Sequence, residues 1–276
     1  MAPGLYVVAT PIGNLRDITL RALDVLAQAD LVLAEDTRVT GKLLSVFGLS
    51  RPLERHDEHA AERARPKAMQ VLAQGGRVAL VSDAGTPLIS DPGYRLVREA
   101  AAAGHAVIPI PGASALLAGL SVAGLPTDRF LFAGFPPARS AARREFLGEL
   151  AGVRATLVFF EGGSRLADSL ADMAQVLGAE REAVVGRELT KLFETVVRGS
   201  LAELAVDPRF AAPKGEIVVM VGPGREVAAT AADADTALAE ALARLRPAEA
   251  AAEVAKALGL PRRDLYRRAL ALKGGA

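Results

Sequence analysis

The residues best suited to chemistry lie in four short loops, each of which follows an apolar, β-like run. The loops span residues 10–17, 35–38, 82–93 and 111–115. Gly13, Gly85 and Gly112 have no Cβ, so the backbone can approach a polar ligand closely there, although turn geometry explains Gly13 and Gly112 equally well. Asp83 can accept hydrogen bonds from a hydroxyl or amine group. Ser114 stands where a helix would begin, so it either contacts a ligand or caps that helix.

Several familiar motifs are absent from the sequence. The first strand is not followed by Gly-x-Gly-x-x-Gly, and there is no P-loop and no Gly-x-Ser-x-Gly elbow, which disfavours standard dinucleotide sites, P-loop sites and that class of hydrolase. The chain has no Cys, which excludes thiolate metal sites and a Cys nucleophile. His56 and His59 lack the i, i+4 spacing of a helical zinc site, so we interpret residues 56–59 as a polar loop and expect no metal.

Regular elements must position these loops, and the first half of the chain alternates strands with helices. Strands are expected at 5–9, 31–34, 78–81 and 106–110, and helices at about 20–26, 60–74 and 93–103. Near-continuous apolar strands alternating with helices are typical of a parallel sheet buried on both faces. Ligands of such sheets bind beside the carboxyl ends of the strands, where the four loops lie. The residues alone therefore predict a glycine-rich cleft for a small polar ligand.

The second half has more strands and fewer helices. Strands are expected at 129–133, 156–160, 183–187, 195–199 and 216–221, and the short gap before 195–199 predicts a hairpin and hence a mixed sheet. The Ala- and Asp-rich stretch 228–235 is typical of a linker. Helices are then expected at about 236–245, 248–258 and 261–272. The last pair is similar to a helix-turn-helix, and a helical hairpin packed on its neighbour fits equally well.

The charge is nearly balanced overall but uneven along the chain. A net charge of +1 excludes a protein that is basic throughout. From residue 256 onward, one acid, Asp264, stands among six basic residues: Lys256, Arg262, Arg263, Arg267, Arg268 and Lys273. A second basic cluster is Arg139, Arg143 and Arg144. Such clusters contact phosphate in nucleic-acid-binding proteins, while a solvated helix face is the more common explanation.

Two segments bear on localisation. Residues 106–126 carry no charge and are long enough to span a bilayer, but their Pro and Gly residues favour a strand, a turn and a buried helix. We therefore expect no membrane association. Residues 1–4 lack the basic and apolar regions of a signal peptide, so we expect a cytoplasmic protein.

Taken together, the loop sequences resemble the bacterial RsmI family, the cytidine 2′-O-methyltransferases of small-subunit ribosomal RNA within the tetrapyrrole-methylase superfamily. The matching runs are 9–18 (ATPIGNLRDI), 34–38 (AEDTR), 82–93 (SDAGTPLISDPG), 111–115 (PGASA), 134–137 (GFPP), 159–161 (FFE), 187–191 (RELTK) with Phe193-Glu194, and 214–216 (KGE). The tail resembles the C-terminal helix-turn-helix module of the family. One departure is HDEHA at 56–60, where the family has His-x-His-Asn.

The resemblance implies a fold and a cofactor. The fold class is α/β, with two tetrapyrrole-methylase-like domains, the first built on a mostly parallel sheet (1–115) and the second on a mixed sheet (116–225), followed by a linker and a small helix-turn-helix-like module (226–276). S-adenosylmethionine (SAM) binds in the cleft between the two α/β domains, and the protein is expected to be a homodimer. The cofactor contacts implied by position are Pro11, Gly13, Asp83, Gly85, Thr86, Ser114, Ala115, Phe160 and Glu216.

The implied reaction also needs groups that activate a hydroxyl. A ribose hydroxyl is a poor nucleophile, so a base, or a cation that stabilises the developing alkoxide, accelerates its methylation. The catalytic candidates in the matching runs are Glu35, Asp36, Arg38, Glu188 and Lys191. The structural alternative is that Glu35 pairs with Arg38, and Glu188 with Lys191, at the surface.

The expected function is therefore SAM-dependent 2′-O-methylation of a decoding-centre cytidine in 16S rRNA of the small ribosomal subunit. Two other functions remain open at this stage. A tetrapyrrole C-methyltransferase would share the cleft but leaves the basic tail unexplained. A non-enzymatic, SAM-responsive regulator would bind nucleic acid through its tail and transfer no methyl group.

Overall fold

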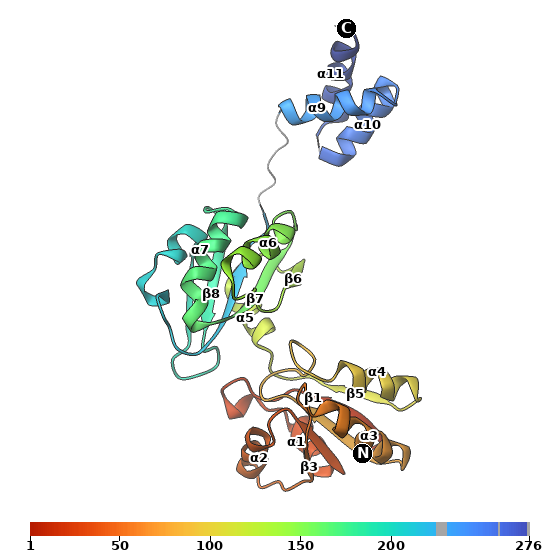
Figure 1. The fold of residues 1–276 in the computed structure, drawn as a ribbon, viewed down its shortest axis with the longest axis vertical. Coiled ribbons are helices and arrows are strands. Elements are labelled where there is room, and N and C mark those ends of the chain that lie inside the picture. Colours follow the sequence, from red (N-terminus) through yellow and green to blue (C-terminus); the bar gives the residue numbers. More distant parts are fainter. Residues whose placement is uncertain (225–230, 259, 275–276) are drawn as a thin grey trace. The chain divides into compact units, whose positions relative to one another are not determined.

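The computed structural model describes residues 1–224, 231–258 and 260–274 (Figure 1). Its contacts group into two units, Met1–Gly224 and Arg225–Ala276. The first unit holds two five-stranded sheets, and the second holds helices. The expected division of the first unit near residue 115 stays a prediction.

The first sheet is entirely parallel, as the sequence predicts. Its strands run in the order β3-β2-β4-β1-β5. The strands are β1 (Gly4–Val8), β2 (Leu31–Ala34), β3 (Leu53–Arg55), β4 (Arg77–Val81) and β5 (Val107–Ile110). The helices between them are α1 (Leu20–Gln28), α2 (Thr37–Val46), α3 (Ala61–Ala73) and α4 (Tyr94–Ala102), with a short 3₁₀ turn, η1 (Leu15–Asp17), before α1. The sequence analysis missed β3 and α2.

Helices cover both faces of this sheet, and successive strand residues point to opposite faces. Tyr6 and Val8 pack with α1 and α2 on one face. Leu5 packs with α3 and α4 on the other face. The local signals agree with these elements: Thr19 caps α1 by accepting a hydrogen bond from the backbone N–H of Ala22 at 3.1 Å. Two-sided burial explains why these strands are apolar at nearly every position.

The second sheet is mixed, with the order β6-β7-β10-β8-β9. Only β6 and β7 pair in parallel, and the other neighbours are antiparallel, which confirms the expected hairpin between β8 and β9. The strands are β6 (Phe130–Phe132), β7 (Thr156–Gly162), β8 (Glu182–Arg187), β9 (Thr195–Ser200) and β10 (Glu216–Val221). The accompanying helices are α5 (Ala115–Ala123), α6 (Ser140–Leu150), α7 (Leu166–Leu177) and α8 (Leu201–Ala205), with the 3₁₀ turns η2 (Gly163–Arg165) and η3 (Pro208–Phe210).

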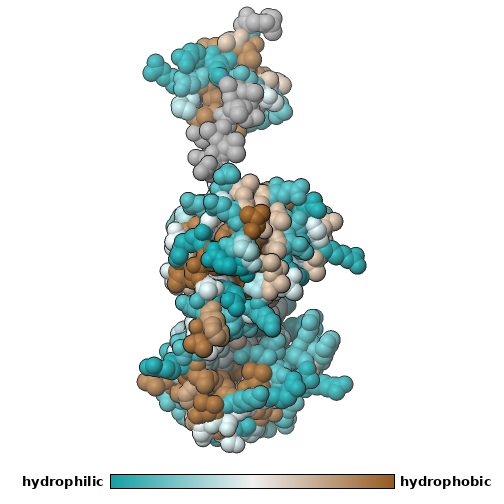
Figure 2. Space-filling view, turned by 90° about the vertical axis from the view of Figure 1, so that its left-hand side faces the viewer, coloured by the Kyte–Doolittle hydropathy of each residue, from teal (hydrophilic) through white to brown (hydrophobic). Residues whose placement is uncertain are grey.

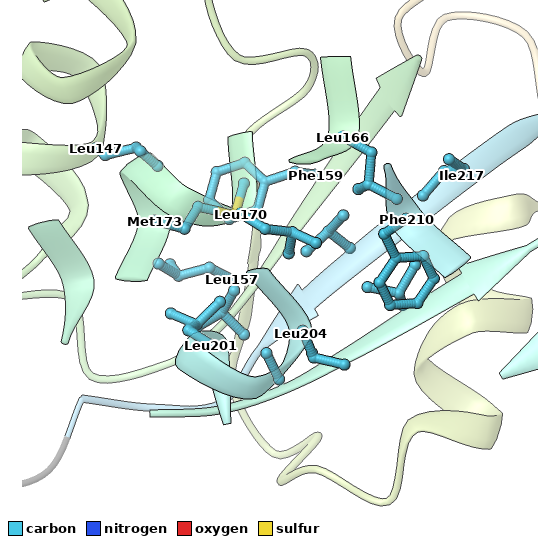
Figure 3. Close-up of a cluster of buried hydrophobic side chains, with 14 residues drawn as sticks. Leu147, Leu157, Phe159, Leu166, Leu170, Met173, Leu201, Leu204, Phe210 and Ile217 are labelled. Atoms are coloured by element: carbon cyan, nitrogen blue, oxygen red, sulfur yellow. The ribbon is translucent and has the colours of Figure 1, made fainter. Parts of the chain in front are cut away.

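The second sheet also has a core on each face. On one face, Phe159 and Leu157 pack with Leu147 of α6 and Leu170 of α7 (Figure 3). On the other face α5 lies against β10. Their close approach needs Gly119, since a Cβ there would lie 3.0 Å from the sulfur of Met220. Helix α5 is thereby fixed against this face of the sheet.

The second unit consists of α9 (Ala231–Leu242), α10 (Pro247–Leu258) and α11 (Arg262–Gly274), each of which packs on the other two. Its core includes Leu238, Val254 and Leu265. The linker expected at 228–235 is wrong for residues 231–235, which begin α9. Ala234 is buried there, so this alanine of the expected linker is instead a packing residue of α9. The rest of that expected linker lies outside the described residues.

The surface mixes polar and apolar side chains, as Figure 2 shows for one face of residues 1–224. Within the described ranges, no helix has the length and apolar character needed to cross a bilayer.

Candidate active site

The loops that follow the strands enclose a cavity of about 410 Å³ in the first unit. This volume lies in the range of small-molecule sites, which is roughly 300–1,000 Å³. Its lining comes from loops at the carboxyl ends of β1, β2, β4 and β5 and from the ends of β6, β7, β8 and β10 that face them. Among the residues proposed from the sequence, Glu35, Asp83, Gly85, Thr86, Ser114, Ala115, Phe160 and Glu216 line the cavity.

The loops on the first sheet hold one another in place. Thr10 and Gly85 form an isolated antiparallel bridge, in which each backbone N–H donates to the other's carbonyl. The hydroxyl of Thr86 donates to the carbonyl of Ala113 at 3.2 Å. The backbone N–H of Asp36 donates to the Asp83 carboxylate at 2.9 Å. Asp83 therefore holds two loops together with one carboxylate oxygen, and its second oxygen is not used in this contact.

Three carboxylates line the cavity on this side, namely Glu35, Asp83 and Asp91. Burial raises the pKa of Glu35, and the nearby charge of Asp83 raises it further. Burial likewise raises the pKa of Asp91 to about 6, with smaller contributions from the charges of Glu35 and Asp83. Ionised carboxylates attract a positively charged ligand, and carboxylates with raised pKa values accept protons more readily than ordinary ones. This wall can therefore bind a cation or take a proton from a ligand.

Backbone strain is concentrated at the same cavity. Among the described residues, the non-glycine residues with positive φ are Leu88, Ser90, Glu188 and Thr190, at 77°, 67°, 52° and 68°. The first pair lies in the 82–93 loop and the second pair lies in the segment between β8 and β9, and both segments line the cavity. Each such residue costs on the order of 1–3 kcal/mol and persists where surrounding contacts enforce it. In these two loops, surrounding contacts hold the backbone in a conformation that the residues disfavour, and this conformation sets the direction of their side chains.

Lys191 forms a clamp across the first unit. Its Nζ lies 2.8 Å from Oε1 of Glu188 and 3.0 Å from Oε2 of Glu216. Its aliphatic chain crosses Gly13, where a Cβ would lie 2.2 Å from Cγ of Lys191. The backbone N–H of Glu216 also donates to the Glu188 carboxylate at 2.9 Å. The loop that follows β1 and the segment that follows β8 are thus in direct contact, and glycine at position 13 makes this possible.

The clamp keeps Lys191 charged. Burial alone lowers the pKa of its ammonium, but the hydrogen bonds to Glu188 and Glu216 outweigh that effect and raise the pKa above its ordinary value. In return, the hydrogen bond from Lys191 lowers the pKa of Glu188. Lys191 is therefore a fixed cation next to a cavity-lining carboxylate and cannot accept a proton at neutral pH.

The amino end of α5 also meets the cavity. Ser114 caps α5, with its hydroxyl accepting a hydrogen bond from the N–H of Leu117 at 3.5 Å, and Ala115 is the first helical residue. Backbone N–H groups in a first helical turn lack helical partners and favour anions. Ser114 is thus a helix cap that also lines the cavity.

The opposite wall is aromatic. Phe160 packs edge-to-face against Phe132, with ring centroids 4.8 Å apart. Phe135 packs in the same manner against Phe160 at 5.6 Å and lines the cavity while 56% exposed. The cavity therefore combines carboxylates, helix N–H groups and an apolar wall.

Six residues proposed from the sequence do not line the cavity, namely Pro11, Gly13, Asp36, Arg38, Glu188 and Lys191. Asp36 caps α2 by accepting from the N–H of Arg38, and the two side chains also form an ion pair. The Arg38 side chain is 86% exposed. The expected pairing of Glu35 with Arg38 is thus wrong, since Arg38 pairs with Asp36, whereas the pairing of Glu188 with Lys191 is confirmed.

Sequence reasoning missed most of the remaining lining residues. They are Ile12, Ala84, Ile89, Ser90, Asp91, Phe135, Glu161, Gly162, Leu189, Gly215, Ile217 and Val218. Most of them lie inside the matching runs but were not singled out as contacts, and only Gly162, Ile217 and Val218 lie just beyond a run. Glu161 is different: its carboxylate accepts from the N–H of Gly162 and from Ser169 and pairs with Arg165 at 2.6 Å. That carboxylate is fully used in holding β7 to α7.

The polar loop expected at 56–59 is wrong at its first residue. His56 is 2% exposed, its N–H donates to the carbonyl of Ala34 at 2.7 Å, and burial lowers its pKa. The residue is therefore buried, and its backbone N–H pairs with the end of β2. Across the described residues, no group of His, Asp and Glu side chains is arranged to hold a metal ion.

The two basic clusters differ in the structure. Arg143 is 3% exposed, and its Nε lies 2.7 Å from the carboxylate of Asp172, so the expected phosphate contact of this residue is wrong. Arg144 also bonds Asp172, at 3.2 Å, while Arg139 is exposed. In the second unit, Arg262, Arg263 and Tyr266 line a surface depression at the start of α11. That helix presents its basic first turn to solvent.

Comparison with known proteins gives two family matches. The tetrapyrrole (corrin/porphyrin) methylases match residues 4–205. The RsmI C-terminal HTH domain matches residues 228–273. Together these matches cover both units of the chain.

Curated relatives match over nearly the whole length. A protein of Mesorhizobium japonicum named ribosomal RNA small subunit methyltransferase I is 54% identical over 275 residues, covering 99% of this chain and 93% of the relative. A protein of Erythrobacter litoralis with the same name is 56% identical over 273 residues, covering 99% and 96%.

Solved structures show the same fold at low identity. The methyltransferase CobJ aligns with a TM-score of 0.61 and 20% identity, covering 80% of this chain and 95% of that one. A uroporphyrin-III-C-methyltransferase from Thermus thermophilus aligns with a TM-score of 0.56 and 22% identity, covering 79% and 93%. At these identities the likeness concerns the fold alone.

Proposed function

The chain belongs to the tetrapyrrole (corrin/porphyrin) methylases and, within them, to the ribosomal RNA small subunit methyltransferase I family, and from this premise we propose that it transfers a methyl group from SAM to the ribose 2′-hydroxyl of a decoding-centre cytidine in 16S rRNA. The observation that carries the proposal is identity above one half to proteins of that name over 99% of the chain, including the C-terminal helices. The site in the first unit supplies the chemistry.

The cavity fits SAM, which supplies an electrophilic methyl group on a positively charged sulfonium. Glu35, Asp83 and Asp91 offer negative charge for that cation. The first turn of α5, at Ser114 and Ala115, suits a carboxylate of the methionine moiety. Phe160, with its apolar neighbours, suits an adenine ring. Gly85 and Thr86 shape the loop between these walls, and Glu216 closes the cavity from the second sheet.

On the acceptor side, Asp91 is our candidate for the proton acceptor. It lines the cavity, and its pKa of about 6 lies closer to neutral pH than that of an ordinary carboxylate. A base is most effective when its pKa is near the working pH while it remains ionised. Glu35, whose pKa burial also raises, is the second candidate. Whichever of the two acts as the base takes the single proton that the ribose hydroxyl loses as its oxygen forms the new bond to carbon.

Lys191 is our candidate for stabilising negative charge on the substrate. Its ammonium is held by Glu188 and by the cavity-lining Glu216. Since its pKa is raised, it acts through its positive charge and not as a base. Asp36 and Arg38 lie outside the cavity and pair with each other, so we assign them the structural role of starting α2.

The partners follow from the same proposal. The basic first turn of α11 is suited to bind RNA phosphates through Arg262 and Arg263. A homodimer is supported by α5, which is apolar except at Ser121 and yet leaves Leu117 and Val122 55% and 38% exposed. Small ribosomal subunits lie in the cytoplasm, which is where we place the protein.

Methyl transfer from isotopically labelled SAM tests the function. Small subunits purified from cells that lack this protein are compared with bare 16S rRNA and with a tetrapyrrole precursor, and the product is mapped by nuclease digestion. We expect label in one 2′-O-methylcytidine of the subunit. Label only in the tetrapyrrole would refute the substrate assignment, and SAM binding without any transfer would refute the enzymatic function.

A further inference from the structure

Phe135 is an apolar ring that lines the cavity and is nevertheless 56% exposed. The residues on either side of Phe135 restrict its backbone conformation. Gly134, with φ of +68°, turns the chain after β6, and two prolines follow directly. A residue before proline is restricted to extended conformations, so the ring is presented from a stiff segment.

The ring is also braced from below. Phe135 contacts Phe160 edge-to-face at 5.6 Å, and Phe160 contacts Phe132 at 4.8 Å. Phe132 and Phe160 pack against the core between the second sheet and α5. This aromatic ladder therefore runs from the core to the mouth of the cavity, and Phe135 is its exposed end.

We propose that Phe135 is the platform on which the base of the target nucleotide stacks while its ribose enters the cavity. The inference rests on the proposed function and adds a substrate-positioning residue to it. A nucleotide in structured RNA must leave its own stack before an enclosed site can reach its 2′-hydroxyl, and an enzyme that replaces the lost stacking with an aromatic ring recovers part of the cost.

The position on the ladder distinguishes the base of the substrate from the adenine of the cofactor. Phe160 is only partly exposed and sits against the core, whereas Phe135 faces solvent at the mouth. A small cofactor fills the inner part of a cavity, and a macromolecular substrate arrives from outside. Since every base has a π-face, Phe135 positions the nucleotide without selecting cytosine.

Substitutions at Phe135 test this role through steady-state methylation of small subunits. Phe135→Ala, which removes the ring, is expected to lower kcat/KM for subunits about 10- to 100-fold, the usual effect of losing one stacked base. Phe135→Leu keeps an apolar side chain without a ring and should show a similar loss. Phe135→Tyr and Phe135→Trp keep a ring and should stay within about threefold of wild type. Phe130→Ala is the matched control, because Phe130 is 44% exposed at the other end of β6 and does not line the cavity.

Cofactor binding is measured on the same variants. The chain contains no Trp, so Phe135→Trp carries a single fluorescent reporter at the site. Titration with S-adenosylhomocysteine should leave its emission nearly unchanged, and calorimetry should give all variants the same affinity for that ligand within about twofold.

Three results would overturn the inference. These are normal kcat/KM in Phe135→Ala, activity of Phe135→Leu equal to that of Phe135→Tyr, and a parallel loss of S-adenosylhomocysteine affinity, which would place Phe135 on the cofactor. A wild-type enzyme that methylates no subunit would instead refute the proposed function, and this inference with it.

Discussion

Substitution of Gly13 by Ala tests whether the clamp formed by Lys191 matters for activity. The new Cβ would lie 2.2, 2.8 and 2.9 Å from Cγ, Cε and Cδ of Lys191, so the lysine chain must move. That movement withdraws Nζ from Glu188 and Glu216, which it now contacts at 2.8 and 3.0 Å. The variant therefore displaces a cation of the site without changing its chemistry.

The energetic cost can be estimated from these contacts. Position 13 has φ of +157°, where a non-glycine residue costs on the order of 1–3 kcal/mol. Glu216 is 73% exposed, so its pairing with Lys191 contributes below about 1 kcal/mol. The pairing with the less exposed Glu188 contributes about 1 kcal/mol after allowance for solvent screening. We expect a total loss of about 2–5 kcal/mol, which a folded enzyme of this size tolerates.

The effect on activity is expected to be larger than the effect on folding. Loss of one preorganised group that stabilises transition-state charge lowers kcat by about 10²–10³. We expect such a loss for Lys191→Ala, and a loss of at least about tenfold for Gly13→Ala, measured as methyl transfer to small subunits. Gly75→Ala is the matched control, because Gly75 has φ of +75° and a Cβ there meets open space. It also places an alanine at a positive φ, without displacing a neighbour, and should keep full activity.

A double-mutant cycle makes the reasoning refutable. If Gly13→Ala acts by moving Lys191, then adding it to Lys191→Ala costs no further activity, and the coupling energy equals the effect of the glycine substitution. A double variant that loses the two factors in full would show that Gly13 acts independently of Lys191. Thermal unfolding of all variants excludes loss of fold as the cause.

Three further predictions concern charge. Folding raises the pKa of Asp91 from 3.8 to about 6, so the stability of the protein falls as the pH rises through this window. Asp91→Asn should therefore raise the free energy of unfolding at pH 7 by about 1 kcal/mol, after discounting for the partial exposure of Asp91. The same substitution should lower methyl transfer and remove the loss of activity below pH 6. Asp172→Ala leaves the buried Arg143 unpaired and should destabilise the protein by about 3–5 kcal/mol in urea unfolding; an unchanged midpoint would contradict the buried pair. Replacing Arg262 and Arg263 by Gln should weaken subunit binding and flatten its salt dependence, with unchanged affinity for SAM; equal losses of both would point to a structural role.

The sequence predicts the first sheet well because its signal is local. Strands buried on both faces must be apolar throughout, and this pattern is visible in the runs that become β1, β2 and β4. The missed strand β3 has only three residues, two of them charged, Glu54 and Arg55. It is a strand because it pairs with β2 at the edge of the sheet, and edge strands need no apolar pattern.

The candidate site is only partly visible in the sequence, because its loops meet through tertiary contacts. The glycines and acids after each strand could be found, since strand ends in a parallel sheet share one edge. The contact of Gly13 with Lys191 joins segments from different sheets, and nothing local in either segment indicates it. Arg143 shows the opposite error: a charged residue on a helix suggests solvent exposure, and only its ion pair with Asp172 explains its burial.

The distribution of strain and charge supports a division of labour between the two sheets. The first sheet supplies carboxylates whose pKa values are raised by burial. One of them, Asp91, directly follows the strained residue Ser90 in the sequence. The second sheet supplies a fixed cation, Lys191, from a segment strained at Glu188. Either group accelerates methyl transfer to a hydroxyl, because a base removes the proton and a cation stabilises negative charge on the acceptor. The contact of Lys191 with the first-sheet loop joins the segments that carry these groups, so we expect a substitution at position 13 to affect both walls of the site.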